Sequence, residues 1–382
     1  MSTQSSLVSC TLSELGLPKR AMPRPEHLRQ PDYAEKFDDD TLLYDIFRRG
    51  NYIYLIGPTL FDTARLKHLL AHIQIDPHTK LKYACYFSKQ IFKIVIDASN
   101  INTNFIQIYN KQFPIRRSPY ENNRFNKVLY TKQKDNDPAW IKDWILWYYN
   151  IYGVELVILY DNASTKYTIN ELKAYLADVP CQVIIESFPF KFGARLWEGS
   201  EQDSMFLQWA MLEHARYYVC GNRGYFFSFD IDELLIFKDL STINWNQTPY
   251  HYIQFKGHWA FLDAGQYSGT DSIIRHTSHS IVEKQHFSAK EGKYIAFLDK
   301  LRLDDFLLVH RIKRPAESKQ PLVIYKPSDA YFLHFRSITT NWKWDRTKPE
   351  IFDSQIHHRT DIEQIEKQLT AHKKPSPTHF QN

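Results

Sequence analysis

Two aspartates, Asp230 and Asp232, stand at alternate positions directly after the apolar run 225–229. In an extended segment, residues two apart point to the same side, so both carboxylates can reach one ligand. Carboxylates beside an apolar run need a partner, and hard oxygen ligands suit Mg²⁺ or Mn²⁺. The pair therefore predicts a divalent-cation site completed by the phosphates of a nucleotide. The alternative interpretation is a helix N-terminus with acidic caps.

Two further polar clusters follow apolar runs of strand length. One cluster is 131–136, and the other is 161–164, which follows the run 154–160. In an open sheet of parallel strands, ligands bind beyond the carboxyl ends of the strands. We therefore expect both clusters and the aspartate pair to meet at one edge of a sheet.

The segments between these clusters carry clear helix signals. Asp137 and Pro138 are typical of a helix start and Gly153 of a helix end. Thr168 and Glu171 have the spacing of a capping box, which predicts a second helix. A third helix is expected over 203–218, and strands are expected over 127–131, 154–160, 182–186 and 225–231. This alternation predicts an α/β fold, with a mostly parallel sheet and helices on both faces.

The chain divides into four predicted parts. Residues 1–45 are a polar leader with several prolines, and 46–120 form a small α/β accessory domain of short β-rich runs. Residues 121–345 hold the strand and helix alternation as the main domain, and 346–382 form a C-terminal helical or basic tail. A length of 382 residues fits one large domain with additions, because single cores stop growing at roughly 250–300 residues.

Composition excludes several classes of protein. The 48 basic and 43 acidic residues leave a net charge of +5, which is too small to indicate a nucleic-acid partner. No stretch reaches the roughly 18–20 apolar residues of a membrane-spanning helix. The four cysteines lie far apart and no secretory leader precedes them, so we expect free thiols in a cytoplasmic protein. Peripheral association with the inner face of the membrane is compatible with this expectation.

Five short segments of the sequence form a series with a defined order and spacing. They are Trp140–Trp144, Tyr148–Val154, Leu159–Ser164, Gln208 with Glu213–Arg216, and Phe229–Leu234. In its order and spacing the series resembles the GT-A glycosyltransferases of family 92 and their bacterial family 2-like relatives, over about residues 125–340. The sequence departs from the family pattern at Ala163 and Lys166. The resemblance implies a Rossmann-like GT-A domain that takes a sugar from a nucleotide-sugar donor.

The resemblance also implies roles for individual residues. Donor binding falls to Thr131, Lys134, Asp161, Asn162 and Asp230, and binding of Mn²⁺ or Mg²⁺ falls to Asp230, Asp232 and His334. Lys293 and His310 match further positions often seen in the group. His334 lies in the apolar run 331–335, where an imidazole needs a partner, and the alternative is a core histidine. His214 and Arg216 likewise either point to the site or belong to the aromatic core.

The resembled families invert the configuration at the transferred sugar, and such a reaction needs a general base for the acceptor hydroxyl. Asp263, at the end of the run 259–263, is the candidate, with Asp304 and Asp305 as rivals. Trp259 and its aromatic neighbours form either a sugar-stacking platform or core.

We therefore expect a metal-dependent, inverting glycosyltransferase that uses a UDP-sugar donor and a saccharide or glycolipid acceptor, in surface polysaccharide or glycan assembly. A nucleotidyltransferase or phosphoryl-transfer enzyme would use the same aspartates, but the Gly-rich phosphate loops typical of such enzymes do not occur in the sequence. A non-catalytic carbohydrate-binding protein with a degenerate GT-A fold is the third alternative. Nucleotide binding with and without Mn²⁺ separates the three.

Overall fold

The fold is taken from a computed structural model of the chain. The structure describes residues 6–75, 81–122, 124–194, 206–237, 248–263, 274–287, 292–338, 340 and 351–352. Most of the predicted C-terminal tail therefore lies outside the described residues, as does the expected helix start at 203–205. No helix in these ranges is long and apolar enough to cross a membrane. All four cysteines are free, and two of them, Cys10 and Cys220, are buried.

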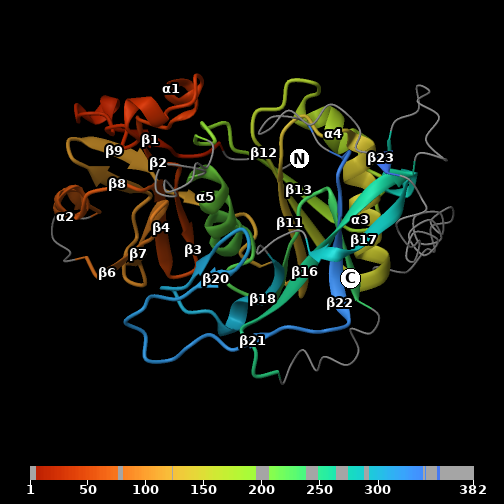
Figure 1. The fold of residues 1–382 in the computed structure, drawn as a ribbon. Helices are drawn as coiled ribbons and strands as arrows, with labels where there is room; N and C mark the ends of the chain where they lie inside the picture. Colours follow the sequence, from red (N-terminus) through yellow and green to blue (C-terminus); the bar gives the residue numbers. More distant parts are fainter. Residues whose placement is uncertain are drawn as a thin grey trace.

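The N-terminal part is built mainly of antiparallel strands (Figure 1). Its central sheet has the order β10-β3-β4-β7-β6, and two smaller sheets have the orders β1-β2 and β5-β8-β9. The elements are β1 (Cys10–Thr11), η1 (Ser13–Leu15), η2 (Glu26–Leu28), α1 (Tyr33–Lys36), β2 (Thr41–Leu43), β3 (Asp45–Arg49), β4 (Tyr52–Pro58), α2 (Thr63–Ala71), β5 (Ile73–Gln74), β6 (Tyr83–Phe87), β7 (Ile91–Asp97), β8 (Phe105–Ile108), β9 (Lys111–Pro114) and β10 (Arg116–Arg117).

The larger part is a mixed sheet flanked by helices. Four parallel strands, in the order β13-β12-β11-β14, continue into β18, β16, β22 and β15, where antiparallel pairs enter. The elements are β11 (Lys127–Gln133), α3 (Pro138–Tyr152), β12 (Leu156–Asp161), α4 (Ile169–Tyr175), β13 (Gln182–Ser187), α5 (Phe206–His214), the π-helical turn η4 (Ala215–Val219), β14 (Tyr225–Ser228), β15 (Glu233–Phe237), β16 (Tyr252–Asp263), η6 (His276–Ser278), β17 (His279–Phe287), β18 (Lys293–Phe297), η7 (Leu298–Lys300), β19 (Phe306–Leu307), β20 (Ile312–Lys313), β21 (Ile324–Tyr325), β22 (Ala330–Phe335) and β23 (Ile351–Phe352).

Alternation along the parallel strands sends side chains into two different cores. On β12, Val157 and Leu159 enter the core that contains α3, whereas Leu156 and Ile158 enter the core that contains α5 and η4. A strand buried on both faces reads as a continuous apolar run, which explains why no polar residue interrupts 156–160. The expectation of an α/β fold is confirmed, and the main sheet is mixed, with antiparallel pairs beyond its four parallel strands.

Local sequence signals set the ends of the helices between the strands. The Asp137 side chain accepts a hydrogen bond from the Ala139 amide, and Gly153 ends α3 in the left-handed region with φ 62°. Thr168 and Glu171 form the expected capping box at the start of α4. The strand expected over 225–231 is shorter than predicted, because β14 ends at Ser228 and a turn precedes β15. The aspartate pair therefore lies in a turn between two strands.

The N-terminal sheet and the main sheet share one hydrophobic core. α5 and η4 lie between the two sheets (Figure 1), and Phe47 and Tyr54 of the N-terminal sheet belong to the same core as Tyr130 of β11. Buried ion pairs cross this contact: Lys93 of β7 bonds Glu213 of α5 at 2.6 Å, and both side chains are fully buried. The N-terminal residues thus complete the core behind the parallel strands.

Candidate active site

The carboxyl ends of β11, β12, β13 and β14 meet at one edge of the sheet, because the four strands are parallel neighbours. β18 runs antiparallel to β14 and starts at that same edge, with Tyr294 opposite Ser228. The turn that carries Asp230 and Asp232 lies directly beyond the end of β14. This edge therefore gathers the polar clusters that the sequence places after its strands.

Two buried lysines hold the carboxylate of Asp230. Lys132 of β11 bonds Oδ1 at 2.6 Å, and Lys293 of β18 bonds Oδ2 at 2.6 Å. The lysine side chains are 5% and 3% exposed, whereas the Asp230 side chain is 31% exposed. Lys132 belongs to the polar cluster 131–136 that was expected at this edge, although it was not selected as a site residue, and Lys293 was selected only through the family pattern. The structure shows both at the same carboxylate.

Asp232, Glu233 and His334 form a second cluster beside this one. One ligand atom from each lies within 4.8 Å of the other two. Nε2 of His334 is 3.0 Å from Oδ2 of Asp232. The sheet makes this contact, because Glu233 of β15 pairs with His334 of β22 and the Phe335 amide donates to the Asp232 carbonyl at 2.8 Å. Glu233, which the sequence analysis did not select, also accepts a hydrogen bond from the Asp230 amide at 2.8 Å.

The charges in this cluster shift one another's titration. Burial alone would lower the pKa of His334, but the adjacent Asp232 carboxylate outweighs it and raises that pKa. Burial favours the protonated form of Asp232, yet His334 lowers its pKa below the usual range. Burial raises the pKa of Glu233 despite Lys293 at 3.1 Å. A site with this many coupled charges is typical of a place where a charged ligand binds.

Trp259 lies against the imidazole of His334. The two rings stack with centroids 4.2 Å apart, and the guanidinium of Arg336 lies over the tryptophan ring at 4.3 Å. The parallel pairing of β16 with β22 puts Trp259 opposite His334. In the structure, Trp259 packs against the candidate metal ligand, and its role as a sugar platform remains a prediction.

A second group of site residues lies at the ends of β11 and β12. The carboxylate of Asp161 accepts hydrogen bonds from Ser164 and Gln133, and the side-chain amide of Asn162 donates to the carbonyls of Phe188 and Phe190, both at 2.9 Å. A hollow of about 460 Å³ opens here, lined by Asp161, Ala163, Ser164, Thr165, Lys166, Tyr167, Thr168, Ile169, Glu171, Ser187 and Pro189. Asp161 and Asn162 shape this hollow through the backbone they hold.

The other predicted donor-binding residues lie in and after β11, and the predicted general base lies at the end of β16. Thr131 is buried within β11, and Lys134 is half-buried in the loop that follows. Asp263 is the last residue of β16, pairs with Phe352 of β23, and has a side chain outside the described residues.

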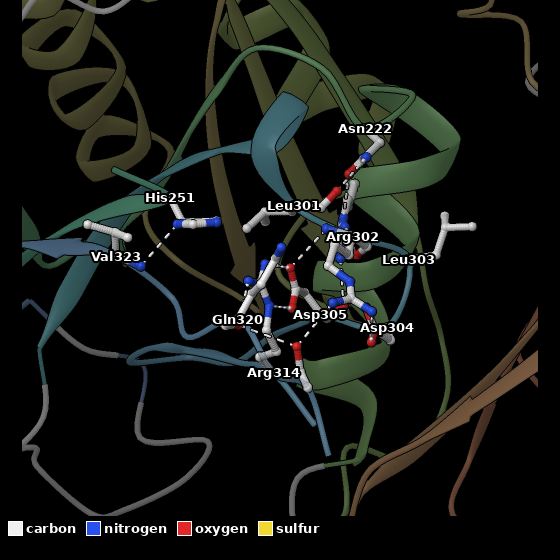
Figure 2. A network of polar contacts seen from close by, with 12 residues as sticks. Asn222, His251, Leu301, Arg302, Leu303, Asp304, Asp305, Arg314, Gln320 and Val323 are labelled. Carbon is white, nitrogen blue, oxygen red and sulfur yellow. Dashed lines mark hydrogen bonds and ion pairs between the residues drawn. The ribbon is translucent and has the colours of Figure 1, made fainter. Parts of the chain in front are cut away.

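The rival bases Asp304 and Asp305 belong to a different polar network (Figure 2). Both oxygens of Asp305 bind the guanidinium of Arg314 at 2.7 Å, and Oδ2 also accepts the Arg302 amide at 2.8 Å. Asp305 is fully buried, and Asp304 is paired with the Arg302 side chain at 3.0 Å. The carboxylate of Asp305 therefore serves to hold the 302–314 segment together.

His214 and Arg216 belong to the core. His214 is fully buried, with Nε2 2.9 Å from Asp45 and Nδ1 2.6 Å from the hydroxyl of Tyr160. Arg216, also buried, donates to the carbonyls of Asp305 and Arg302. The interpretation of His214 as a structural histidine among aromatic rings is confirmed.

Comparison with known proteins identifies the family. The chain matches the sequence profile of glycosyltransferase family 92 over residues 131–372. A search among curated proteins finds no match. The matched region covers more than half of the chain and contains both clusters described above. The protein therefore belongs to glycosyltransferase family 92.

Membership of this family makes the protein a glycosyltransferase, an enzyme that takes a sugar from a donor and passes it to an acceptor. This class of activity is the one that the sequence analysis placed first, ahead of nucleotidyl or phosphoryl transfer and of carbohydrate binding without catalysis.

Proposed function

We propose that the protein is a metal-dependent, inverting glycosyltransferase with a GT-A fold, which moves a sugar from a UDP-sugar to a saccharide or lipid-linked saccharide. The observation that carries this proposal is the cluster of Asp232, Glu233 and His334 at the carboxyl edge of four parallel strands, next to two buried lysines. We place the enzyme in the cytoplasm, where nucleotide-sugars would reach it directly.

The cluster fits Mn²⁺ or Mg²⁺ by its donor chemistry. Asp232 offers a carboxylate oxygen and His334 an imidazole nitrogen, and their close approach matches a set of ligands around one small ion. We propose that these two residues are ligands of the ion and that Glu233 lies within reach of it. We propose that Asp230 contacts the donor. When bound, the ion would stabilise the negative charge of the departing diphosphate.

Lys132 and Lys293 support binding of a diphosphate. Their ammonium groups converge on Asp230 from two strands, so they offset the charge of the carboxylates that a diphosphate would otherwise meet at this position. Charge-assisted hydrogen bonds of this kind are the strong ones. The hollow around Asp161 lies at the end of the adjacent strand, and we propose that it takes the nucleoside, with Thr131, Lys134 and Asn162 around it.

Asp263 remains the proposed general base. It lies four residues beyond Trp259 on β16, which places its Cα about 13 Å further along the strand at the usual rise per residue.

The test is calorimetric titration of UDP with Mn²⁺ or with a chelator. We expect Mn²⁺-dependent binding to the parent protein. Loss of a residue that hydrogen-bonds a metal ligand commonly costs 10–100-fold in metal affinity, so loss of a ligand itself in Asp232→Asn should weaken this binding by more than about 100-fold. Asp178→Asn is the matched control, because Asp178 pairs with Lys142 and is 68% exposed. Equal binding by the parent and Asp232→Asn would contradict the proposal, as would binding that ignores the metal.

A further inference from the structure

The turn that carries the two aspartates is held at its middle residue, Ile231, by a histidine side chain. The carbonyl of Ile231 accepts a hydrogen bond from Nε2 of His276 at 2.8 Å. His276 is fully buried, and its ring packs edge to face on Phe335 with centroids 4.9 Å apart. The peptide between the aspartates is therefore fixed by a side chain that comes from a segment 45 residues later.

A carboxylate on α3 fixes that segment in turn. Asp143, which is 6% exposed, binds Arg275 through both oxygens, with Nε at 2.6 Å from Oδ2. Nδ1 of His276 lies 3.8 Å from the same carboxylate, too far for a hydrogen bond but within electrostatic reach. Trp140, one turn earlier on α3, donates from its indole to the carbonyl of Ile274 at 2.6 Å. The helix thus holds residues 274–276 at two points.

We propose that Asp143, Arg275 and His276 act together as a positioning device for the turn that carries Asp230 and Asp232. The two carboxylates diverge from the Ile231 peptide, one toward the lysines and the other toward His334. A rotation of that peptide would displace both carboxylates at once. The inference rests on the proposed function for its catalytic meaning, whereas the support of the turn is a property of the chain alone. Asp143 and Trp140 belong to the aromatic motif over 140–144.

His279 offers a matched control. It is also fully buried, packs on the same Phe335 ring with centroids 5.1 Å apart, and bonds the carbonyl of Arg275 at 3.0 Å. It makes no described contact with the turn. Removal of either imidazole leaves a similar space beside Phe335, but only the loss of His276 removes the hydrogen bond to Ile231.

The experiment measures hydrogen exchange of the peptide amides over 229–235 in metal-free protein, together with the affinity for Mn²⁺ by calorimetry. In His276→Ala we expect the turn to exchange at least about tenfold faster and Mn²⁺ to bind about 10–100-fold more weakly. His276→Gln, whose amide can place a nitrogen near the position of Nε2, should restore both. His279→Ala should leave both near the parent values.

Equal acceleration in His276→Ala and His279→Ala would overturn the inference, as would a failure of His276→Gln to restore the turn. If the alanine variant does not fold, His276→Leu keeps much of the volume without the donor and takes its place. A parent protein that binds no Mn²⁺ would contradict the proposed metal site, and the exchange measurement would still decide whether His276 holds the turn.

Discussion

The buried ion pair between Lys93 and Glu213 connects the N-terminal sheet to α5, and we expect it to affect how the stability of the protein depends on pH. Nζ of Lys93 contacts Oε2 of Glu213 at 2.6 Å, the hydroxyl of Tyr217 at 3.2 Å and the carbonyl of Asp305 at 2.9 Å. Burial lowers the pKa of Lys93 from 10.5 to about 8, even with the carboxylate so close. The buried lysine therefore lowers the stability of the folded protein at neutral pH, where the N-terminal sheet packs against α5.

The sign of the pH effect follows from this shift. Between pH 8 and 10.5 the unfolded chain holds a proton on this lysine that the folded chain has released, so stability from this group rises with pH. With these two pKa values, the destabilisation due to Lys93 falls from about 3 kcal/mol at pH 7.5 to about 1.5 kcal/mol at pH 9.5. Burial raises the pKa of several thiols and tyrosines, and these groups lower the stability of the protein as pH rises over the same range. Only a comparison between variants therefore isolates the contribution of Lys93.

The assay is urea unfolding at pH 7.5 and 9.5 for the parent and for the double variant Lys93→Met with Glu213→Leu. The double variant, which has no charge to titrate at this contact, should lose about 2 kcal/mol more stability than the parent on going to pH 9.5. The single variant Glu213→Gln should lose at least about 1 kcal/mol at pH 7.5, because Lys93 without its counter-charge is driven to release its proton in the folded protein. An identical pH response in the parent and the double variant would refute the reasoning, since it would mean that Lys93 titrates as an exposed lysine.

Three further predictions concern the site and its surroundings. His334→Ala should raise the Mn²⁺ concentration for half-maximal activity by about 10–100-fold, and an unchanged requirement with lowered stability would make His334 a core histidine. Lys293→Met should weaken UDP binding by about tenfold in calorimetry, because one of two converging positive charges is lost; unchanged affinity would exclude a phosphate contact. Burial lowers the pKa of His279 to about 3, so stability falls as pH drops from 6.5 toward 3. His279→Gln should therefore lose about 2 kcal/mol less than the parent between pH 7.5 and 5 in urea unfolding, and equal losses would show that the ring titrates normally.

Local signals in the sequence predicted the elements that flank the site. The ends of α3 follow from Asp137, Pro138 and Gly153, whose conformational preferences act within a few residues. The capping box of α4 is of the same kind. Strands buried on both faces are visible as uninterrupted apolar runs. These features need no knowledge of distant parts of the chain.

Contacts between distant segments could not be predicted in the same way. Lys132 and Lys293 meet at Asp230 from strands far apart in the sequence, and no local pattern marks a lysine as buried. The turn after Ser228 is held by the hydrogen bond from His276 to the Ile231 carbonyl, which joins residues 45 positions apart. The contact between Asp232 and His334 was expected from the family pattern and from the need of a buried imidazole for a partner, and their separation of 3.0 Å agrees with it.

The pairing of β15 with β22 also sets when the site can first exist during synthesis. Asp232 and His334 are 102 residues apart, and the amide of Phe335 bonds the Asp232 carbonyl. A nascent chain that has emerged from the ribosome only as far as β18 carries the two aspartates and both lysines, but it lacks the strand that supplies the imidazole. Translation must therefore proceed past Phe335 before the nitrogen donor can join the carboxylates, and products of premature termination before β22 would carry half of the site.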